Sequence, residues 1–236
     1  TLNEYEDELN KYISGDVKKP VKKVSDNIGS VLSTTDNTEL EDAYGNKIVV
    51  PAGFKIVSDS TTNNAQTVNQ GIVIEDATKT AEGTETSTSG SQFVWIPVGK
   101  IYTDVAKTDA NAKTIELGRY SFDYSTGLES AYSGSYVEED ANDESTLTNT
   151  ENKAIAKNIT NFKNSVTSNG GYYIGRYEAR SSEDDTLTQI TEKGTNPVYN
   201  YVTQIQAAEQ AQNMYNSSKF TSDLMNSYAW DTATLF

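Results

Sequence analysis

The sequence predicts an α+β domain. Two sequence patterns and one feature of the composition favour that class. Short runs of β-branched and aromatic residues, separated by glycine, proline and polar stretches, indicate several short strands. Segments with apolar residues at spacings of three and four indicate amphipathic helices. Aromatic residues make up 10% of the 236 residues, which is typical of a folded chain. We expect an N-terminal helix with a basic linker over residues 1–35, then one domain over residues 36–236.

The first thirteen residues predict an amphipathic helix that ends before Gly15 and Pro20. Its apolar stripe consists of residues about three and four positions apart: Leu2, Tyr5, Leu9, Tyr12 and Ile13. We expect Leu2, Tyr5, Leu9 and Tyr12 to form a surface for a ligand or for assembly. The basic run that follows, Lys18, Lys19, Lys22 and Lys23, is either a solvated linker or a contact with acidic surface on a neighbouring subunit.

Short strands are predicted from about residue 44 onward, at residues 47–50, 53–57, 71–75 and 92–98. The polar stretches 58–70 and 78–91 between them are expected to be exposed loops. Residues 117–124 alternate, so Tyr120, Phe122 and Tyr124 share one face. This face is either an exposed aromatic platform, and so a candidate ligand surface, or the buried face of a strand. A long polar insertion is expected over residues 125–152.

The second half of the chain predicts three helices and one strand. Ile155, Ile159, Phe162 and Val166 follow a helical spacing before the strand at residues 172–179. An alanine-rich helix fits about residues 200–216, where alanine favours both helix formation and close packing. Asn226 is a candidate N-cap of the last helix.

Composition excludes several classes of function. The chain has no cysteine and no histidine, which removes Ser-His-Asp and Cys-His catalysis and the usual zinc ligands. Its net charge of −15 disfavours binding to nucleic acid or to an anionic membrane surface. It has no apolar run of the length that spans a membrane, so a membrane anchor would have to lie upstream. Catalysis by a pair of carboxylates, as in glycoside hydrolysis, is not excluded by the composition, but no spacing in the sequence singles out such a pair.

Two acidic clusters, one within residues 138–144 and one at residues 183–185, are the candidate metal sites. Calcium is the ion that such carboxylates would suit. Neither cluster matches the spacing of the EF-hand loop, and adjacent carboxylates without a glycine turn are typical of a solvated loop. We therefore expect no cofactor, with calcium as the one alternative.

Several segments in order resemble the formylglycine-generating enzyme (sulfatase-modifying factor) family, whose domain is a variant of the C-type lectin fold. The matching segments are residues 50–55, 92–99 (QFVWIPVG), 171–179 (GYYIGRYEA), 196–198 (NPV) before the alanine-rich helix, and 228–233 (YAWDTA). More closely, the chain resembles secreted surface proteins of Gram-positive bacteria that join such a domain to a pilin-like N-terminal helix. The resemblance covers about residues 44–236 and implies a C-type-lectin-like, sulfatase-modifying-factor-like fold.

The departures from the family pattern concern its chemistry. The enzymes of the family work through cysteines, which this chain lacks. Ala179 and Arg180 replace the family's Val-Thr after the strand's glutamate. The later Asn-Val-Trp-Glu-Trp box is missing, which would leave the domain incomplete at its C-terminus. The resemblance therefore implies the fold and argues against the enzyme's reaction.

Four further side chains have alternative interpretations. Arg176 and Glu178 lie two apart on a predicted strand and would face the same way, where they either bridge strands or contact a ligand. The resemblance favours a structural role for Glu178. Trp95 and Trp230 would stack on sugars if exposed, but their strongly patterned segments favour packing in the core.

We expect a non-catalytic extracellular protein of the cell surface, most simply a pilin-like filament or adhesive subunit. Its expected partners are copies of itself or another surface protein. The alternative is a lectin-like module of a monomeric surface protein, with a glycan or a protein as its ligand. A concave site lined by tryptophan or tyrosine with polar neighbours would favour that alternative.

Overall fold

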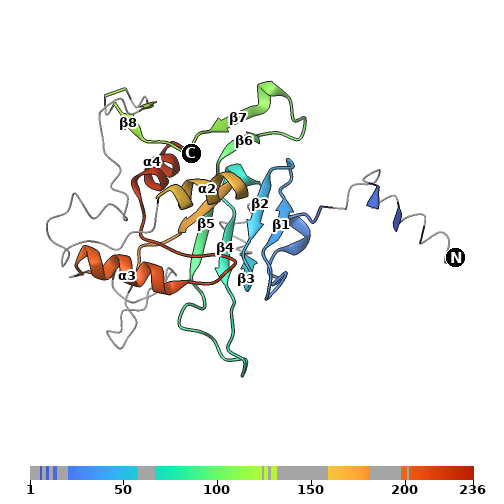
Figure 1. Cartoon of the computed structure of the whole chain (residues 1–236). Coiled ribbons are helices and arrows are strands. Elements are labelled where there is room, and N and C mark those ends of the chain that lie inside the picture. Colours follow the sequence, from blue (N-terminus) through green and yellow to red (C-terminus); the bar gives the residue numbers. More distant parts are fainter. Residues whose placement is uncertain are drawn as a thin grey trace.

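The chain folds as a mixed α+β structure with antiparallel sheets, which confirms the predicted class (Figure 1). The computed structural model describes residues 6, 9, 10, 13, 14, 21–57, 67–123, 125–126, 129–131, 159–180, 198–200 and 202–236. Ile155, Tyr124 and both acidic clusters lie outside the described residues. Within these ranges, no helix is both long enough and apolar enough to cross a membrane.

A four-stranded antiparallel sheet occupies the centre, in the order β10-β5-β4-β3. Its strands are β3 (Phe54–Ile56), β4 (Val73–Asp76), β5 (Gln92–Pro97) and β10 (Gly171–Gly175). Each of the four overlaps a segment that the sequence predicts as a strand, although β4 ends one residue later and β10 begins one residue earlier than predicted. The strand predicted over residues 172–179 is too long, because the chain bends at Arg176 and Tyr177.

Three two-stranded antiparallel pairs accompany the central sheet. They are β1 (Thr38–Glu41) with β2 (Lys47–Val50), β6 (Gly99–Tyr102) with β7 (Ala112–Ile115), and β8 (Tyr120–Phe122) with β9 (Glu129–Ala131). Short 3-10 turns lie at Ser25–Asn27, Val68–Gln70 and Asp109–Asn111. The sequence predicts β2 and a strand around β8, but it misses the other four strands, which are rich in polar residues.

The larger core lies on one face of the central sheet. Phe54, Ile74 and Trp95 point into it, and Trp95 is only 2% exposed, which confirms its predicted place in the core. The Phe54 ring lies 5.5 Å from that of Tyr215 and 5.6 Å from that of Phe220, both edge-on. Each such aromatic pair contributes about 0.5–1.5 kcal/mol beyond the burial of its area.

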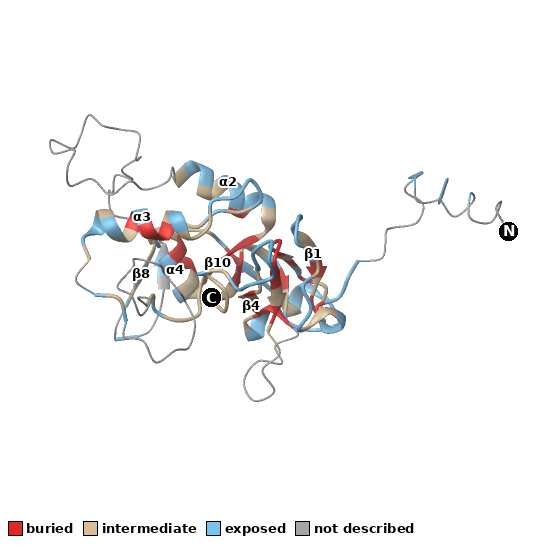
Figure 2. Cartoon of the chain, turned by 90° about the horizontal axis from the view of Figure 1, so that it is seen from below, coloured by how far each residue is buried: buried red, intermediate tan, exposed pale blue. Residues whose placement is uncertain are grey.

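The opposite face of the sheet packs against two helices, α2 (Ile159–Asn169) and α4 (Ser227–Leu235). Ile96 and Tyr172 are paired across β5 and β10 and meet Val166 of α2 and Ala229 of α4. The Tyr172 hydroxyl donates to the Ala229 carbonyl over 2.6 Å. Figure 2 shows the buried residues, in red, gathered in the strands and in parts of α3 and α4.

The helix ends follow the side chains that cap them. Asn226 accepts from the Ala229 amide, so the predicted N-cap of α4 is confirmed. The alanine-rich helix α3 (Gln204–Met214) begins later than predicted, because Thr203 and Gln206 form a capping box there. It also ends earlier than predicted, since Tyr215 leaves the helix and enters the larger core.

Two predictions of exposure are wrong. Trp230 is 62% exposed, because α4 packs through its small residues Ala229 and Thr232 and turns the indole outward. The stretches 58–70 and 78–91 are not exposed throughout, since Val68 and Ser91 are fully buried. The Val68 amide donates to Asp42 over 2.7 Å, which draws this end of the first stretch into the core.

Candidate functional site

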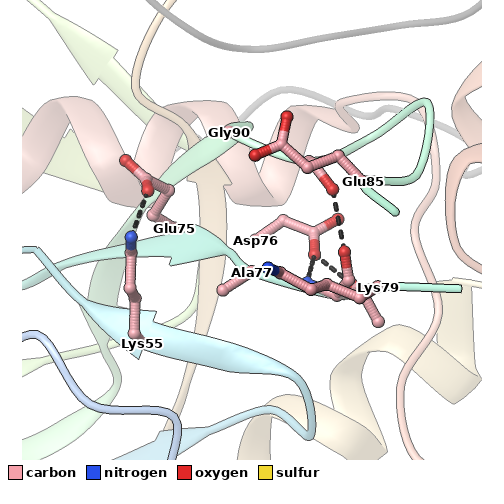
Figure 3. A pocket seen from close by; sticks show the side chains of 9 residues that line it. Lys55, Glu75, Asp76, Ala77, Lys79, Glu85 and Gly90 are labelled. Carbon is pink, nitrogen blue, oxygen red and sulfur yellow. Dashed lines mark hydrogen bonds and ion pairs between the residues drawn. The ribbon is translucent and has the colours of Figure 1, made fainter. Parts of the chain in front are cut away.

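A polar hollow of about 440 Å³ lies where β3 and β4 meet the long hairpin loop of residues 77–91 (Figure 3). Figure 3 shows Lys55 and Glu75 on one side of the hollow and Asp76, Lys79 and Glu85 on the other. Its lining is completed by Ala77, Thr78, Ser89 and Gly90. Carboxylates, ammonium groups and hydroxyls therefore line it, and none of these side chains is aromatic.

One wall continues a row of polar side chains that crosses the whole sheet. Lys55 forms an ion pair with Glu75 at 2.8 Å, and the other Glu75 oxygen accepts from Gln92 at 2.7 Å. Gln92 in turn accepts from Arg176 at 2.7 Å. The antiparallel register places Lys55 opposite Glu75 and Glu75 opposite Gln92, so these side chains share one face. The row fixes the orientation of the wall.

The side of the hollow opposite Lys55 and Glu75 is tied to the core through Asp76, which is only 1% exposed. One carboxylate oxygen accepts from the Thr78 amide at 2.8 Å and also from the Thr78 hydroxyl. The other accepts from Thr88 at 2.6 Å and from Tyr215 at 2.8 Å. Burial, and then the neighbouring Asp76 carboxylate, raise the pKa of Tyr215, which therefore stays a neutral donor.

The hairpin loop that forms the other wall is held together by hydroxyl groups. Ser89 donates to the Thr78 carbonyl at 2.8 Å and accepts from the Thr86 amide at 2.9 Å. Near the tip, the hydroxyls of Thr80 and Thr84 lie 2.6 Å apart. Because these bonds cross between the two limbs of the loop, the wall keeps its shape without an apolar core of its own.

The rim carries one cation and one anion that face each other. Lys79 and Glu85 are partners in an isolated antiparallel bridge, and both side chains are exposed. Neither of them forms an ion pair within the described ranges. They are therefore the charged groups of the hollow that a solute can reach most easily.

The two inner carboxylates of the hollow, Asp76 and Glu75, are already engaged by neighbouring groups. Asp76 would be the natural general base, but four donors already occupy its two oxygens. Glu75 is held by Lys55 and Gln92. A solute in the hollow would therefore meet Asp76 and Glu75 as groups that already accept hydrogen bonds from the protein.

The predicted aromatic platform lies elsewhere, on β8. Tyr120 and Phe122 are half-buried, and neither lines the hollow. The Tyr120 hydroxyl donates to the Glu116 carbonyl at 2.9 Å, and its amide donates to Asp231 at 3.0 Å. Arg119 donates to the same Asp231 oxygen at 2.7 Å. Tyr120 thus helps to anchor β8 on α4, and whether the platform binds a ligand stays a prediction.

Of the predicted N-terminal surface only Leu9 is described, and of the wider apolar stripe Ile13 is described as well. Both are exposed, at 59% and 74%, and the Ser14 amide donates to the Asn10 carbonyl at 2.8 Å. Leu2, Tyr5 and Tyr12 lie outside the described residues. The basic run after this segment is partly satisfied within the chain, since Lys23 pairs with Glu41 at 2.6 Å.

Arg176 and Glu178 do not act as a pair on one strand. β10 ends at Gly175, so Arg176 lies at the bend and reaches Gln92, whereas Glu178 is exposed. The bridging role is thus correct for Arg176 alone. The exposure of Glu178 does not fit the structural role that the resemblance favours.

The described part of the chain holds no group of three or more acidic side chains arranged to bind a metal ion. Both predicted acidic clusters lie outside that part. Sequence reasoning missed the hollow itself, because Lys55, Glu75 and Lys79 come together only through the register of β3 and β4. The one available signal was the density of threonine and serine in the stretch 78–91.

Compared with protein families, with curated proteins and with solved structures, the chain matches none.

Proposed function

We propose that this chain is an extracellular, non-catalytic domain of the cell surface that works by assembly, as a pilin-like filament or adhesive subunit. The observation that carries the proposal is the exposed apolar pair Leu9 and Ile13, four residues apart. Apolar side chains at this spacing share one helix face, and such a face in water favours contact with another protein surface. The acidic composition, with a net charge of −15, suits a protein that stays soluble outside the cell.

The buried carboxylates of the domain support the proposal of a structural protein, because they accept hydrogen bonds from the domain's own loops. Asp42, like Asp76, is buried and accepts from four donors: the amides of Tyr44, Asn46 and Val68 and the side chain of Asn46. These two carboxylates hold loops in place. We also propose the finer fold, a C-type-lectin-like domain of the sulfatase-modifying-factor type that an N-terminal helix precedes.

A single cysteine tests assembly directly, because the chain contains none of its own. If the apolar stripes of two copies meet, Leu9→Cys will form a disulfide-linked dimer under mild oxidation. Lys47→Cys, on exposed β2 surface, serves as the control and should dimerise much more slowly. Equal rates for the two variants would contradict a specific contact at Leu9.

A lectin-like module is the second candidate function, and the exposure of Trp230 favours it. An indole presented on a helix surface is suited to stack on the apolar face of a sugar ring. Nearby on α4, the Tyr228 ring is contacted by the Lys163 ammonium at 3.8 Å from its centroid. A glycan array screened with the native chain and with Trp230→Ala tests this candidate. Binding that the substitution leaves unchanged would count against Trp230 as the platform.

A further inference from the structure

We propose that the polar hollow beside β4 is a binding site for a neutral saccharide of one or two rings. This inference rests on the second candidate function, a lectin-like module, and places its ligand away from Trp230. A volume of about 440 Å³ lies within the range of ligand pockets, roughly 300–1,000 Å³. The lining then decides which ligands fit.

The lining favours a ligand rich in hydroxyl groups. Thr78 and Ser89 contribute hydroxyls, Lys55 and Lys79 contribute donors, and Glu75 contributes acceptors. No aromatic or large aliphatic side chain lines the hollow, so an apolar ligand would gain little from entering it. A saccharide carries donors and acceptors on every side and can exchange hydrogen bonds with both walls.

The charges favour a neutral ligand over an anionic one. Lys55 and Lys79 are outnumbered by Glu75, Asp76 and Glu85, and the whole chain carries a net charge of −15. The negative electrostatic potential of the hollow and of the whole chain would therefore repel phosphate or carboxylate ligands. Glu75 pairs with Lys55 and Asp76 has four donors, so among the described lining residues Glu85 is the one carboxylate without an ion pair or a hydrogen-bond donor. A single exposed carboxylate supplies too few oxygen ligands for a cation such as calcium.

The side chains of Lys55 and Glu75 hold each other in place before any ligand binds, and each can still form further hydrogen bonds. The Lys55 ammonium has three N–H groups, of which Glu75 takes one. Each Glu75 oxygen accepts one bond and has a second lone pair. Because these side chains are already fixed by each other, binding costs little side-chain entropy. Lys79 and Glu85 at the rim are the groups that would close on a ligand.

We expect weak binding, with a dissociation constant of roughly 1 mM, because the hollow offers no aromatic ring for stacking. The test is a two-dimensional amide NMR titration of the intact, isotope-labelled chain with glucose, galactose, mannose and N-acetylglucosamine, each up to about 100 mM. The expected result is saturable shifts at the amides of Thr78, Lys79 and Gly90 for at least one sugar.

The double variant Lys79→Ala/Glu85→Ala should weaken this binding at least about tenfold and leave the rest of the spectrum unchanged. Its matched control is Lys47→Ala/Glu39→Ala, which removes an exposed lysine–glutamate pair of 2.7 Å from the β1–β2 pair. That control should bind as the native chain does. The native-like spectrum of each variant shows that it is folded.

Four results would overturn the inference. Shifts at Trp230 without shifts at the hollow would refute this site and leave the lectin-like function standing. The absence of shifts with every sugar would count against both. Binding at the hollow that survives the rim variant, or that the control variant weakens equally, would refute the assignment of ligand contacts to Lys79 and Glu85.

Discussion

The Tyr215 hydroxyl donates a hydrogen bond of 2.8 Å to the buried carboxylate of Asp76, although the two residues lie 139 positions apart. This bond joins the end of α3 to the start of the hairpin loop that walls the hollow. It also belongs to the larger core, where the Tyr215 ring packs against Phe54 and Phe93. Fold and candidate site therefore depend on the same two side chains.

Tyr215→Phe keeps the ring and removes the donor, so it measures the bond alone. The buried carboxylate then lacks one of its partners, and we expect the free energy of unfolding to fall by about 1–3 kcal/mol. Urea denaturation followed by tryptophan fluorescence measures it. Tyr199→Phe is the control, since its hydroxyl takes part in a longer bond of 3.4 Å with Gln210, and it should cost clearly less.

Gly171→Ala tests the close contact between β10 and β5. A methyl group there would lie 2.5 Å from the Ile96 carbonyl oxygen and 2.5 Å from Cζ2 of the buried Trp95. Neither neighbour can move far, so we expect a loss of about 1–3 kcal/mol from overpacking. Gly83→Ala controls for backbone strain, because Gly83 has a φ of 83° with open space around it. Equal losses at the two positions would contradict the packing explanation.

The ion pair between Arg119 and Asp231 should hold α4 against β8. Its side chains are only 25% and 13% exposed, and the same Asp231 oxygen accepts from the Tyr120 amide. We expect Asp231→Asn to destabilise the fold by about 1–2 kcal/mol, more than loss of an exposed pair would. Asp109→Asn, which breaks the exposed pair with Lys100, is the comparison. If thermal unfolding shows the two variants to be equally stable, the partly buried pair contributes no more than the exposed one.

Stability should decrease in alkaline solution because of three tyrosines of the core, of which Tyr172 is buried and Tyr173 and Tyr215 are partly buried. Burial raises the pKa of Tyr172, Tyr173 and Tyr215 above the ordinary value of 10.0. In the unfolded chain these phenols ionise near pH 10, whereas in the folded chain they stay protonated. A raised folded pKa gives stability that is complete below pH 10 and is lost as the pH rises further.

Urea midpoints measured between about pH 8 and pH 11 test this prediction. We expect a steady fall above pH 10, with a smaller slope in Tyr173→Phe, because that variant has one phenol fewer to ionise. A midpoint that stays constant over this range would show that these phenols ionise as readily in the folded chain. A slope in Tyr173→Phe equal to that of the native chain would show that Tyr173 does not contribute to the fall.

The local parts of the fold could be predicted from sequence, and the long-range parts could not. The strands of the central sheet are short β-branched and aromatic runs, and Asn226 is recognisable as an N-cap because capping depends on neighbouring residues. The row from Lys55 to Arg176 depends on strand register instead, and its Arg176–Gln92 bond spans 84 positions. No local pattern encodes such a pairing.

Trp230 shows the same limit at a single residue. Its place in a strongly patterned segment favours burial, but the helix packs through Ala229 and Thr232. Small side chains let α4 approach the sheet closely, and this rotates the larger tryptophan toward solvent. The surface that a short helix packs against decides which of its faces is buried. The sequence pattern of the helix does not show that surface.

Sedimentation velocity of the chain over a range of concentrations tests most directly whether it works by assembly through the exposed stripe of Leu9 and Ile13. We expect the native chain to self-associate in the range of about 10–100 μM. Leu9→Asp/Ile13→Asp should stay monomeric there, because two carboxylates would have to be desolvated in the contact. A native chain that is monomeric throughout, or a variant that associates equally, would contradict the account.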